Sequence, residues 1–151
     1  MRILLTGSSG FVGQNLSASL RLRNVEVLEP SSSELNLLDP TSVSSYLEVN
    51  DPDLIVHAAG KVGGIQANID SQSRFLVENT QMGFNLLTMA KYHGVPRVLN
   101  LASSCIYPAH AKNPLREESL LCGSLEPTNE GYALAKISVM KLGLFLSDKS
   151  F

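Results

Sequence analysis

The sequence contains no tryptophan, only two cysteines and no marked excess of charge of either sign. Two cysteines, Cys105 and Cys122, are too few for a disulfide framework. Lys and Arg number 12 against 14 Asp and Glu, so the chain lacks the basic excess that attracts nucleic acid. No apolar run approaches the ~18 residues that cross a bilayer. We therefore expect neither a nucleic-acid partner nor a membrane span.

A signal peptide and a metal site are not expected either. The N-terminal residues lead directly into an apolar run, which leaves no room for a signal peptide, and we expect a cytoplasmic protein. The three histidines, His57, His93 and His110, show no ligand spacing, and each is interpreted as structural. At 151 residues the chain has the length of one domain.

Apolar runs alternate with helical patterns along the chain. The runs that predict strands cover residues 3–5, 25–28, 35–37, 54–57 and 98–101, and the helical patterns cover residues 11–22, 41–49, 74–93 and 132–146. Gly94 and Pro96 are typical of the end of a helix. Continuous apolar strands separated by helices predict an α/β fold with a doubly wound parallel sheet of the Rossmann type.

A glycine-rich turn follows the first expected strand. Its glycines, Gly7, Gly10 and Gly13, have the spacing G-x-x-G-x-x-G, and Ser9 stands where the standard dinucleotide fingerprint has its second glycine. Taken alone, this pattern also fits an ordinary turn between a strand and a helix. Its place after the first strand favours a site where backbone N–H groups and a helix N-terminus, which begins with Phe11 and Val12, hold a pyrophosphate.

Polar residues with possible catalytic roles lie at the carboxyl end of the last expected strand and on the last expected helix. Tyr132 and Lys136 lie four positions apart, so they share a helix face, and the ammonium is expected to lower the pKa of the phenol. Ser103 follows the strand at 98–101, where its hydroxyl could bind a carbonyl oxygen. Serines that simply cap a strand end, and a Tyr-x-x-x-Lys pair that arises by chance, are the alternatives.

Together these features resemble the extended short-chain dehydrogenase/reductase superfamily. Four segments, at residues 34–39, 61–65, 103–108 and 125–130, resemble the GDP-L-fucose synthase family within it, and the resemblance runs from residue 2 to about residue 142. Members epimerise C3 and C5 of GDP-4-keto-6-deoxy-D-mannose and then reduce C4 with NADPH. The resemblance therefore implies a GDP-sugar substrate, NADP as cofactor and GDP-L-fucose as product.

The resemblance also assigns roles to single residues. Tyr132 would protonate the C4 oxygen, Ser103 would bind it, Lys136 would tune Tyr132 and contact the nicotinamide ribose, and Cys105 would be the acid or base of epimerisation. If its stretch stays extended, Cys105 points the same way as Ser103; a small apolar filler is the alternative. Cys122 matches no catalytic position.

Further positions are assigned to the cofactor. Asn36 and Leu37 would meet the adenine, and Ala58, Ala59 and Gly60 would line the ribose-phosphate side. Asn79 would either hold a water of the proton relay or be a structural polar residue. The predicted cofactor residues are Gly7, Ser9, Gly10, Phe11, Val12, Gly13, Asn36, Leu37, Ala58, Ala59, Gly60, Tyr132 and Lys136. Helices 74–93 and 132–146 are expected to form a homodimer.

The sequence departs from the family in two ways. Glu29 and the serines after it stand where the family usually has an arginine for the 2′-phosphate, and Ser9 replaces a commonly basic residue; NAD is therefore an alternative to NADP. Residues 1–151 also correspond to about half of a family member. We expect an incomplete dinucleotide-binding domain, truncated before the substrate domain and before the histidine that partners Cys105, and inactive on its own. Another nucleotide-sugar epimerase or dehydratase, or a non-catalytic nucleotide-binding module, are the alternatives.

Overall fold

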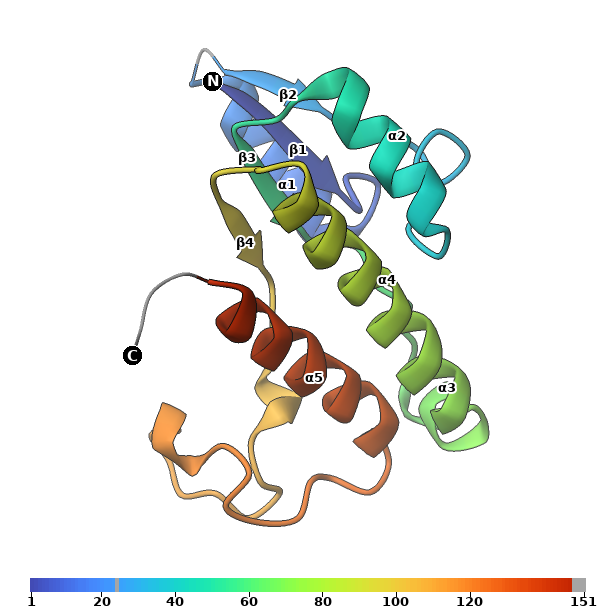
Figure 1. Ribbon diagram of the computed structural model, residues 1–151. Coiled ribbons are helices and arrows are strands. Elements are labelled where there is room, and N and C mark those ends of the chain that lie inside the picture. The colour runs from blue at the N-terminus through green and yellow to red at the C-terminus, as the bar shows by residue number, and fades with distance from the viewer. Residues whose placement is uncertain (24, 148–151) are drawn as a thin grey trace.

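The computed structural model describes residues 1–23 and 25–147, which form a parallel sheet with helices on both faces (Figure 1). Its strands are β1 (Arg2–Thr6), β2 (Glu26–Leu28), β3 (Leu54–His57) and β4 (Val98–Asn100), in the order β2-β1-β3-β4. All neighbouring pairs are parallel. The predicted α/β doubly wound fold of the Rossmann type is confirmed. No helix in the described part of the chain is both long and apolar enough to span a membrane.

The strand order reverses direction at β1. From β1 the chain passes to β2 on one side and then returns to β3 on the other, and Thr6 pairs with His57 where β1 and β3 end. Ligands of open α/β sheets bind at such a switch point, beyond the carboxyl ends of the strands. The glycine turn after β1 and the loop after β3 therefore meet at the expected edge of the sheet.

The helices bury the alternating side chains of the strands on two faces. On one face α1 (Phe11–Arg21) packs Leu16 and Leu20 over Ile3, Leu5 and Val56. On the other face α2 (Pro40–Asn50) and α4 (Gln72–Tyr92) enclose a core of Leu4, Ile55, Val43, Leu47 and Leu86. The helix α5 (Glu130–Leu146) packs along α4 and beside β4 (Figure 1).

Local signals explain where several helices begin and end. The Asp39 carboxylate accepts a hydrogen bond of 2.9 Å from the Thr41 amide, and Pro40 occupies the first turn, so α2 begins there. Gly94 follows α4 with a φ of 70°, the left-handed conformation that a glycine adopts without strain. The glycine signal at the end of this helix is thus confirmed.

One predicted strand is wrong, and one helix was missed. Residues 35–37 form no strand, because their polar groups bond locally: the Leu38 amide donates to Asn36 Oδ1 and the Asn36 amide donates to Ser42 Oγ. Leu35 and Leu37 are buried nonetheless, which accounts for the apolar pattern. The missed helix is α3 (Ile65–Asp70), which has only six residues and leaves Ile65 and Ile69 exposed, so it is too short to give a clear helical pattern.

The long segment between β4 and α5 contains two short 3₁₀ turns, η1 (Ser104–Ile106) and η2 (Glu117–Ser119). Its start is anchored, because η1 packs against α5 through Ile106, Ala133 and Ile137. Since no regular strand or α-helix forms there, the absence of periodicity in the sequence was informative.

The crossing of α4 and α5 provides a stability test. A methyl group on Gly83 of α4 would lie 2.4 Å from Val139 Cγ2 of α5, whereas one on Gly143 would lie 3.7 Å from Leu87 Cδ1, an ordinary contact. We expect Gly83→Ala to lower the free energy of unfolding by about 1–3 kcal/mol through overpacking. The matched Gly143→Ala should raise it by about 0.5–1 kcal/mol, because alanine favours a helix interior. Urea denaturation measures both, and equal effects would contradict the close approach.

Candidate cofactor and catalytic site

A cavity of about 880 Å³ lies at the switch point of the sheet. It is lined by the glycine turn, the start of α1, the loops that follow β2 and β3, and two residues of α4. The predicted cofactor residues that line it are Gly7, Ser9, Gly10, Phe11, Val12, Gly13, Asn36, Leu37, Ala58, Ala59 and Gly60. Tyr132 and Lys136 lie outside this lining. The structure thus brings eleven of the thirteen predicted positions around one cavity.

The glycine turn is shaped by backbone contacts that leave no room for a side chain at its first and last glycines. Gly7 has a φ of 73°, and a methyl group on it would lie 2.6 Å from the Ala59 nitrogen. A methyl group on Gly13 would lie 2.1 Å from the Gly7 carbonyl oxygen. No side chain caps the N-terminus of α1, which leaves its first backbone N–H groups as donors for an anion. These features fit the pyrophosphate of a dinucleotide.

A buried pair joins β1 to β3 beneath the cavity. The Thr6 hydroxyl and His57 Nδ1 lie 2.8 Å apart, and both residues are almost fully buried. Burial, and then the charge of Lys136, lower the pKa of His57 to about 4. His57 is therefore neutral at physiological pH and has a structural role, as the sequence suggested. His93 contacts Ser44 Oγ through Nε2, and His110 is exposed.

Lys136 is the point at which several elements of the site converge. Lys136 is only 7% exposed, and its Nζ donates a hydrogen bond of 3.1 Å to the carbonyl oxygen of Leu101, just after β4. The same Nζ lies 5.7 Å from the centroid of the Tyr132 ring. A methyl group on Gly60 would lie 3.9 Å from it. Lys136 therefore sits between the cavity, the end of β4 and Tyr132.

The expected lowering of the pKa of Tyr132 by Lys136 is wrong. The pKa of Tyr132 is raised, because burial disfavours the phenolate and a charge on Cys105 repels it. Burial also lowers the pKa of Lys136, opposed by Cys105. The spacing in the sequence correctly predicted that the two side chains lie together, but it carried no information about the burial of the phenol, which is the largest cause of the raised pKa.

Ser103 and Cys105 follow β4 as predicted, but the chain between them is not extended. Ser103 has extended dihedral angles, and η1 begins at the next residue, so that Cys105 lies within a 3₁₀ turn. The condition under which both side chains would point the same way, an extended stretch, is therefore not met. Cys105 is half-buried against the cluster around Ile106, while Cys122 is exposed; both are free thiols.

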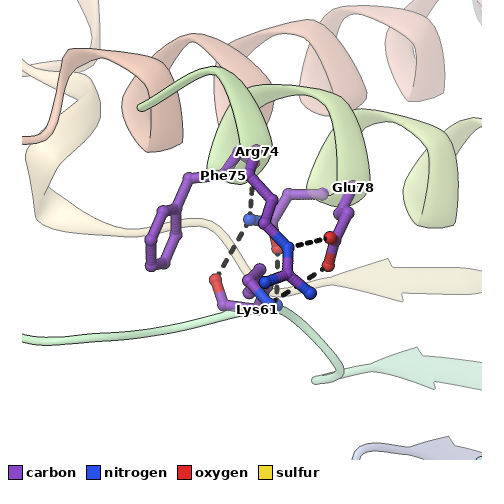
Figure 2. A network of polar contacts seen from close by, with 5 residues as sticks. Lys61, Arg74, Phe75 and Glu78 are labelled. Atoms are coloured by element: carbon purple, nitrogen blue, oxygen red, sulfur yellow. Dashed lines mark hydrogen bonds and ion pairs between the residues drawn. The ribbon is translucent and has the colours of Figure 1, made fainter. Parts of the chain in front are cut away.

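The Asn79 side chain connects the loop after β3 to α4. Its Oδ1 accepts a hydrogen bond of 2.8 Å from the Lys61 amide, and its Nδ2 donates to the carbonyl oxygens of Lys61 and Phe75. The side chain therefore holds the loop after β3 against α4. Figure 2 shows this network from close by, with Lys61 beside the helix that carries Phe75 and Glu78.

Charged residues of the cavity were missed by the sequence analysis. Lys61 forms an ion pair of 3.3 Å with Glu78, which also binds Arg74 (Figure 2). Both Lys61 and Glu78 line the cavity. Lys61 belongs to one of the segments that carried the family resemblance, and this was the available signal. Arg21 of α1 pairs with Glu29 after β2, a contact that no spacing rule indicates.

The parallel sheet, with a glycine turn at its switch point, defines a Rossmann-like α/β protein. A sequence model of the NAD dependent epimerase/dehydratase family matches residues 3–147, and the chain belongs to this family. The expected membership of the wider superfamily, and the resemblance to GDP-L-fucose synthases, are confirmed by these and the following similarities.

Several named relatives are 42–52% identical to the chain over 141–142 aligned residues. The chain is 52% identical over 142 residues to GDP-L-colitose synthase of Yersinia pseudotuberculosis, covering 94% of this chain and 46% of that protein. It is 43% identical to GDP-L-fucose synthase of Azorhizobium caulinodans, covering 93% of this chain and 45% of that protein. The chain spans about half the length of the curated relatives it matches.

Solved structures of related reductases have the same fold. MlghC, a GDP-mannoheptose C4 reductase from Campylobacter jejuni with NADP bound, superposes with a TM-score of 0.88 at 27% identity, covering 93% of this chain and 45% of that one. A GDP-L-fucose synthetase from Naegleria fowleri bound to NADP has a TM-score of 0.85 at 26% identity, covering 95% of this chain and 43% of that one.

Proposed function

We propose that this chain is the dinucleotide-binding part of an NADP- or NAD-dependent GDP-sugar epimerase and reductase. The reaction is the conversion of GDP-4-keto-6-deoxy-D-mannose to GDP-L-fucose. The observation that carries the proposal is the position of Lys136, whose Nζ lies near the Tyr132 ring, the Leu101 carbonyl and the rim of the cavity at Gly60. The names of the relatives support the substrate class.

The residues of the chain would act on the C4 carbonyl of the sugar. When bound, the cofactor supplies the hydride that reduces C4. The Tyr132 hydroxyl donates its proton to the C4 oxygen, and the Ser103 hydroxyl donates a hydrogen bond to the same oxygen. The raised pKa of Tyr132 suits this role, because it keeps the phenol protonated and ready to donate. Lys136 positions Tyr132 through its contact with the ring and its anchor on Leu101.

Cys105 would take part in epimerisation at the carbons next to this carbonyl. A ketone acidifies the protons on its neighbouring carbons, and the donors that polarise the C4 oxygen increase this acidity. Cys105 is half-buried in η1, which packs against the helix that carries Tyr132 and Lys136. Its thiolate would remove the proton, or its thiol would return one.

The sheet itself supports a longer protein in which residues 1–151 are the incomplete cofactor domain. In the described residues, no strand pairs with the outer edge of β4. Leu99, in the middle of β4, is 53% exposed, although strands of parallel sheets are normally covered on both faces. A hollow of about 770 Å³ borders this edge between α4 and α5. Further chain that continues the sheet would cover these surfaces.

We also propose that two copies associate through α4 and α5 as a homodimer, and that the protein is cytoplasmic. The dimer is supported by large apolar side chains exposed on these helices, namely Val77, Phe84, Leu134 and Phe145. Sedimentation equilibrium of the protein and of Val77→Glu tests the dimer. The substitution should shift the protein toward monomer.

Three alternatives to this proposed reaction can be distinguished by their cofactor binding and their products. GDP-L-colitose is a second candidate product, favoured by the 52% identity to a synthase of that name. Another nucleotide-sugar epimerase or dehydratase would bind the same cofactor but form neither product. A non-catalytic module would bind the dinucleotide and turn over no sugar.

An assay of binding and product formation tests the proposal. The protein is titrated with NADPH and NADH by fluorescence, and it is then incubated with GDP-4-keto-6-deoxy-D-mannose and each cofactor while products are identified by mass spectrometry and NMR. We expect saturable dinucleotide binding in the chain, and GDP-L-fucose from the protein that contains the substrate domain. In that protein Tyr132→Phe should lower turnover by about 100-fold or more.

The matched control is Tyr92→Phe, because Tyr92 is exposed at the end of α4, outside the cavity. Equal activity of Tyr132→Phe and Tyr92→Phe would contradict the role of Tyr132. Dinucleotide binding without any product from the longer protein would favour the non-catalytic module.

A further inference from the structure

The part of the cavity next to the end of β2 is acidic. Here it is lined by Glu29, Ser31, Ser32 and Glu34, which we call the β2 corner. In Rossmann-type sites, the residue that ends the second strand contacts the ribose of the adenosine, about 20 residues after the glycine turn. The chemistry of the β2 corner therefore bears on whether that ribose has a free 2′-hydroxyl or a 2′-phosphate.

Glu29 is held as a carboxylate in this corner. Its side chain is 16% exposed, and it forms an ion pair with Arg21 of α1. A hydrogen bond from the Ser17 hydroxyl, and to a smaller extent Arg21, hold the pKa of Glu29 below its usual value against the opposing effect of burial. A fixed carboxylate of this kind accepts hydrogen bonds from a ribose diol.

Glu34 places a second negative charge at the same corner. Its Oε2 accepts hydrogen bonds of 2.8 Å from the Ser31 amide and 2.7 Å from the Ser31 hydroxyl, and these bonds lower its pKa. They also occupy the amide and the hydroxyl of Ser31, two donors that could otherwise bind a phosphate at this position. Both carboxylates are therefore present, and ionised, where a 2′-phosphate would have to lie.

Two basic side chains in or beside the cavity are each paired with a carboxylate. Of the described residues that line the cavity, Lys61 is the one with a basic side chain, and it pairs with Glu78 on α4. Arg21 lies outside the lining and binds Glu29. A dianionic phosphate placed at the β2 corner would meet like charges, whereas a free 2′-hydroxyl would find an acceptor.

We propose that Glu29 and Glu34 make this site select NAD(H), with its free 2′-hydroxyl, over NADP(H). This inference rests on the proposed function, since it concerns the cofactor of the same site. It separates the chain from its structural neighbours described as holding NADP. Glu29 is the acceptor for the ribose, and Glu34 adds repulsion of a phosphate. Arg21 moderates the selectivity by neutralising part of the charge of Glu29.

The test is a fluorescence titration of the protein with NADH and with NADPH, without sugar substrate. We expect NADH to bind about tenfold more tightly, equal to about 1.4 kcal/mol. The preference should shrink when the salt concentration rises from about 0.05 M to about 0.5 M, because repulsion between partly exposed charges is screened. A ratio of two affinities is insensitive to partial unfolding, which lowers both equally.

Three variants should change the ratio of the two affinities, each in a defined direction. Glu29→Gln keeps the size of the side chain and removes its charge, so the preference for NADH should fall, and Glu34→Gln should lower it by a smaller amount. Arg21→Ala removes the counter-charge of Glu29, so the preference should rise. The matched control is Glu48→Gln, which changes the net charge equally on the exposed side of α2, outside the cavity, and should leave the ratio unchanged.

The outcomes separate this inference from the proposed function. If neither dinucleotide binds, the proposed function fails. If both bind but NADPH is equal or tighter, the selectivity inference alone is wrong. If, in addition, Arg21→Ala weakens NADPH and spares NADH, then Arg21 is a phosphate ligand and the assignment of Glu29 is overturned.

Discussion

Substitution of Gly13 by alanine is expected to lower the affinity for NADH by about 100-fold or more, because it opens the turn that would hold the pyrophosphate. The new methyl group would lie 2.1 Å from the Gly7 carbonyl oxygen, 2.7 Å from Ser8 Cα and 2.8 Å from the Gly7 carbonyl carbon. All three are backbone atoms, so no side-chain rotation relieves the overlap. The turn must move away from α1, and its N–H groups would lose their common direction toward the anion.

Gly10→Ala provides the matched control for this prediction. Its methyl group would lie 3.3 Å from the Gly7 carbonyl oxygen, and its φ of −77° suits alanine, so a small adjustment accommodates it. We expect an affinity within a few-fold of the original protein, in line with a cost below ~1 kcal/mol. Gly83→Ala, which strains the fold far from the turn, controls for general destabilisation. Equal affinity of Gly13→Ala and Gly10→Ala would contradict the proposed cradle.

The sequence predicted those parts of the molecule that follow from apolar periodicity and backbone chemistry. Four apolar runs became β1 to β4, and the glycine turn lies at the switch point because it directly follows β1. Eleven residues of the cavity lining could be predicted for the same reason, since the carboxyl ends of neighbouring parallel strands meet at one edge. Local patterns were sufficient wherever position in the sheet determines proximity.

The errors concern properties that arise only from tertiary contacts. Residues 35–37 look like a strand because Leu35 and Leu37 are buried, yet local hydrogen bonds of Asn36 take the place of sheet pairing. The pKa of Tyr132 depends on how much water its ring loses, which the spacing to Lys136 cannot reveal. The ion pair between Arg21 and Glu29 joins a helix to a strand end, so neither residue indicates the other in the sequence.

The buried His57 is expected to make the free energy of unfolding depend on pH. The pKa of its imidazole is lowered from 6.5 to about 4 in the folded chain, because burial and Lys136 disfavour the charged form. The unfolded chain therefore binds a proton that the folded chain does not bind between these two values. The contribution is fully present above pH 6.5 and is lost as the pH falls toward 4, by about 3 kcal/mol in all.

Urea denaturation at several pH values between 7.5 and 4.5 measures this dependence, and substitutions isolate the group responsible. His57→Asn keeps a polar group near Thr6 but cannot titrate, so most of the loss of stability between about pH 6.5 and pH 5 should disappear. The carboxylates Glu29, Glu34 and Glu78 do not mask the effect, because their pKa values are lowered from 4.5 and they gain protons below this range.

His110→Asn is the matched control, since His110 is exposed in the segment before α5. A pH dependence that is unchanged in His57→Asn and flattened in His110→Asn would show that the buried Thr6–His57 pair does not couple protonation to folding. A flattening in His57→Asn alone would instead place that coupling at the junction of β1 and β3, beneath the cavity.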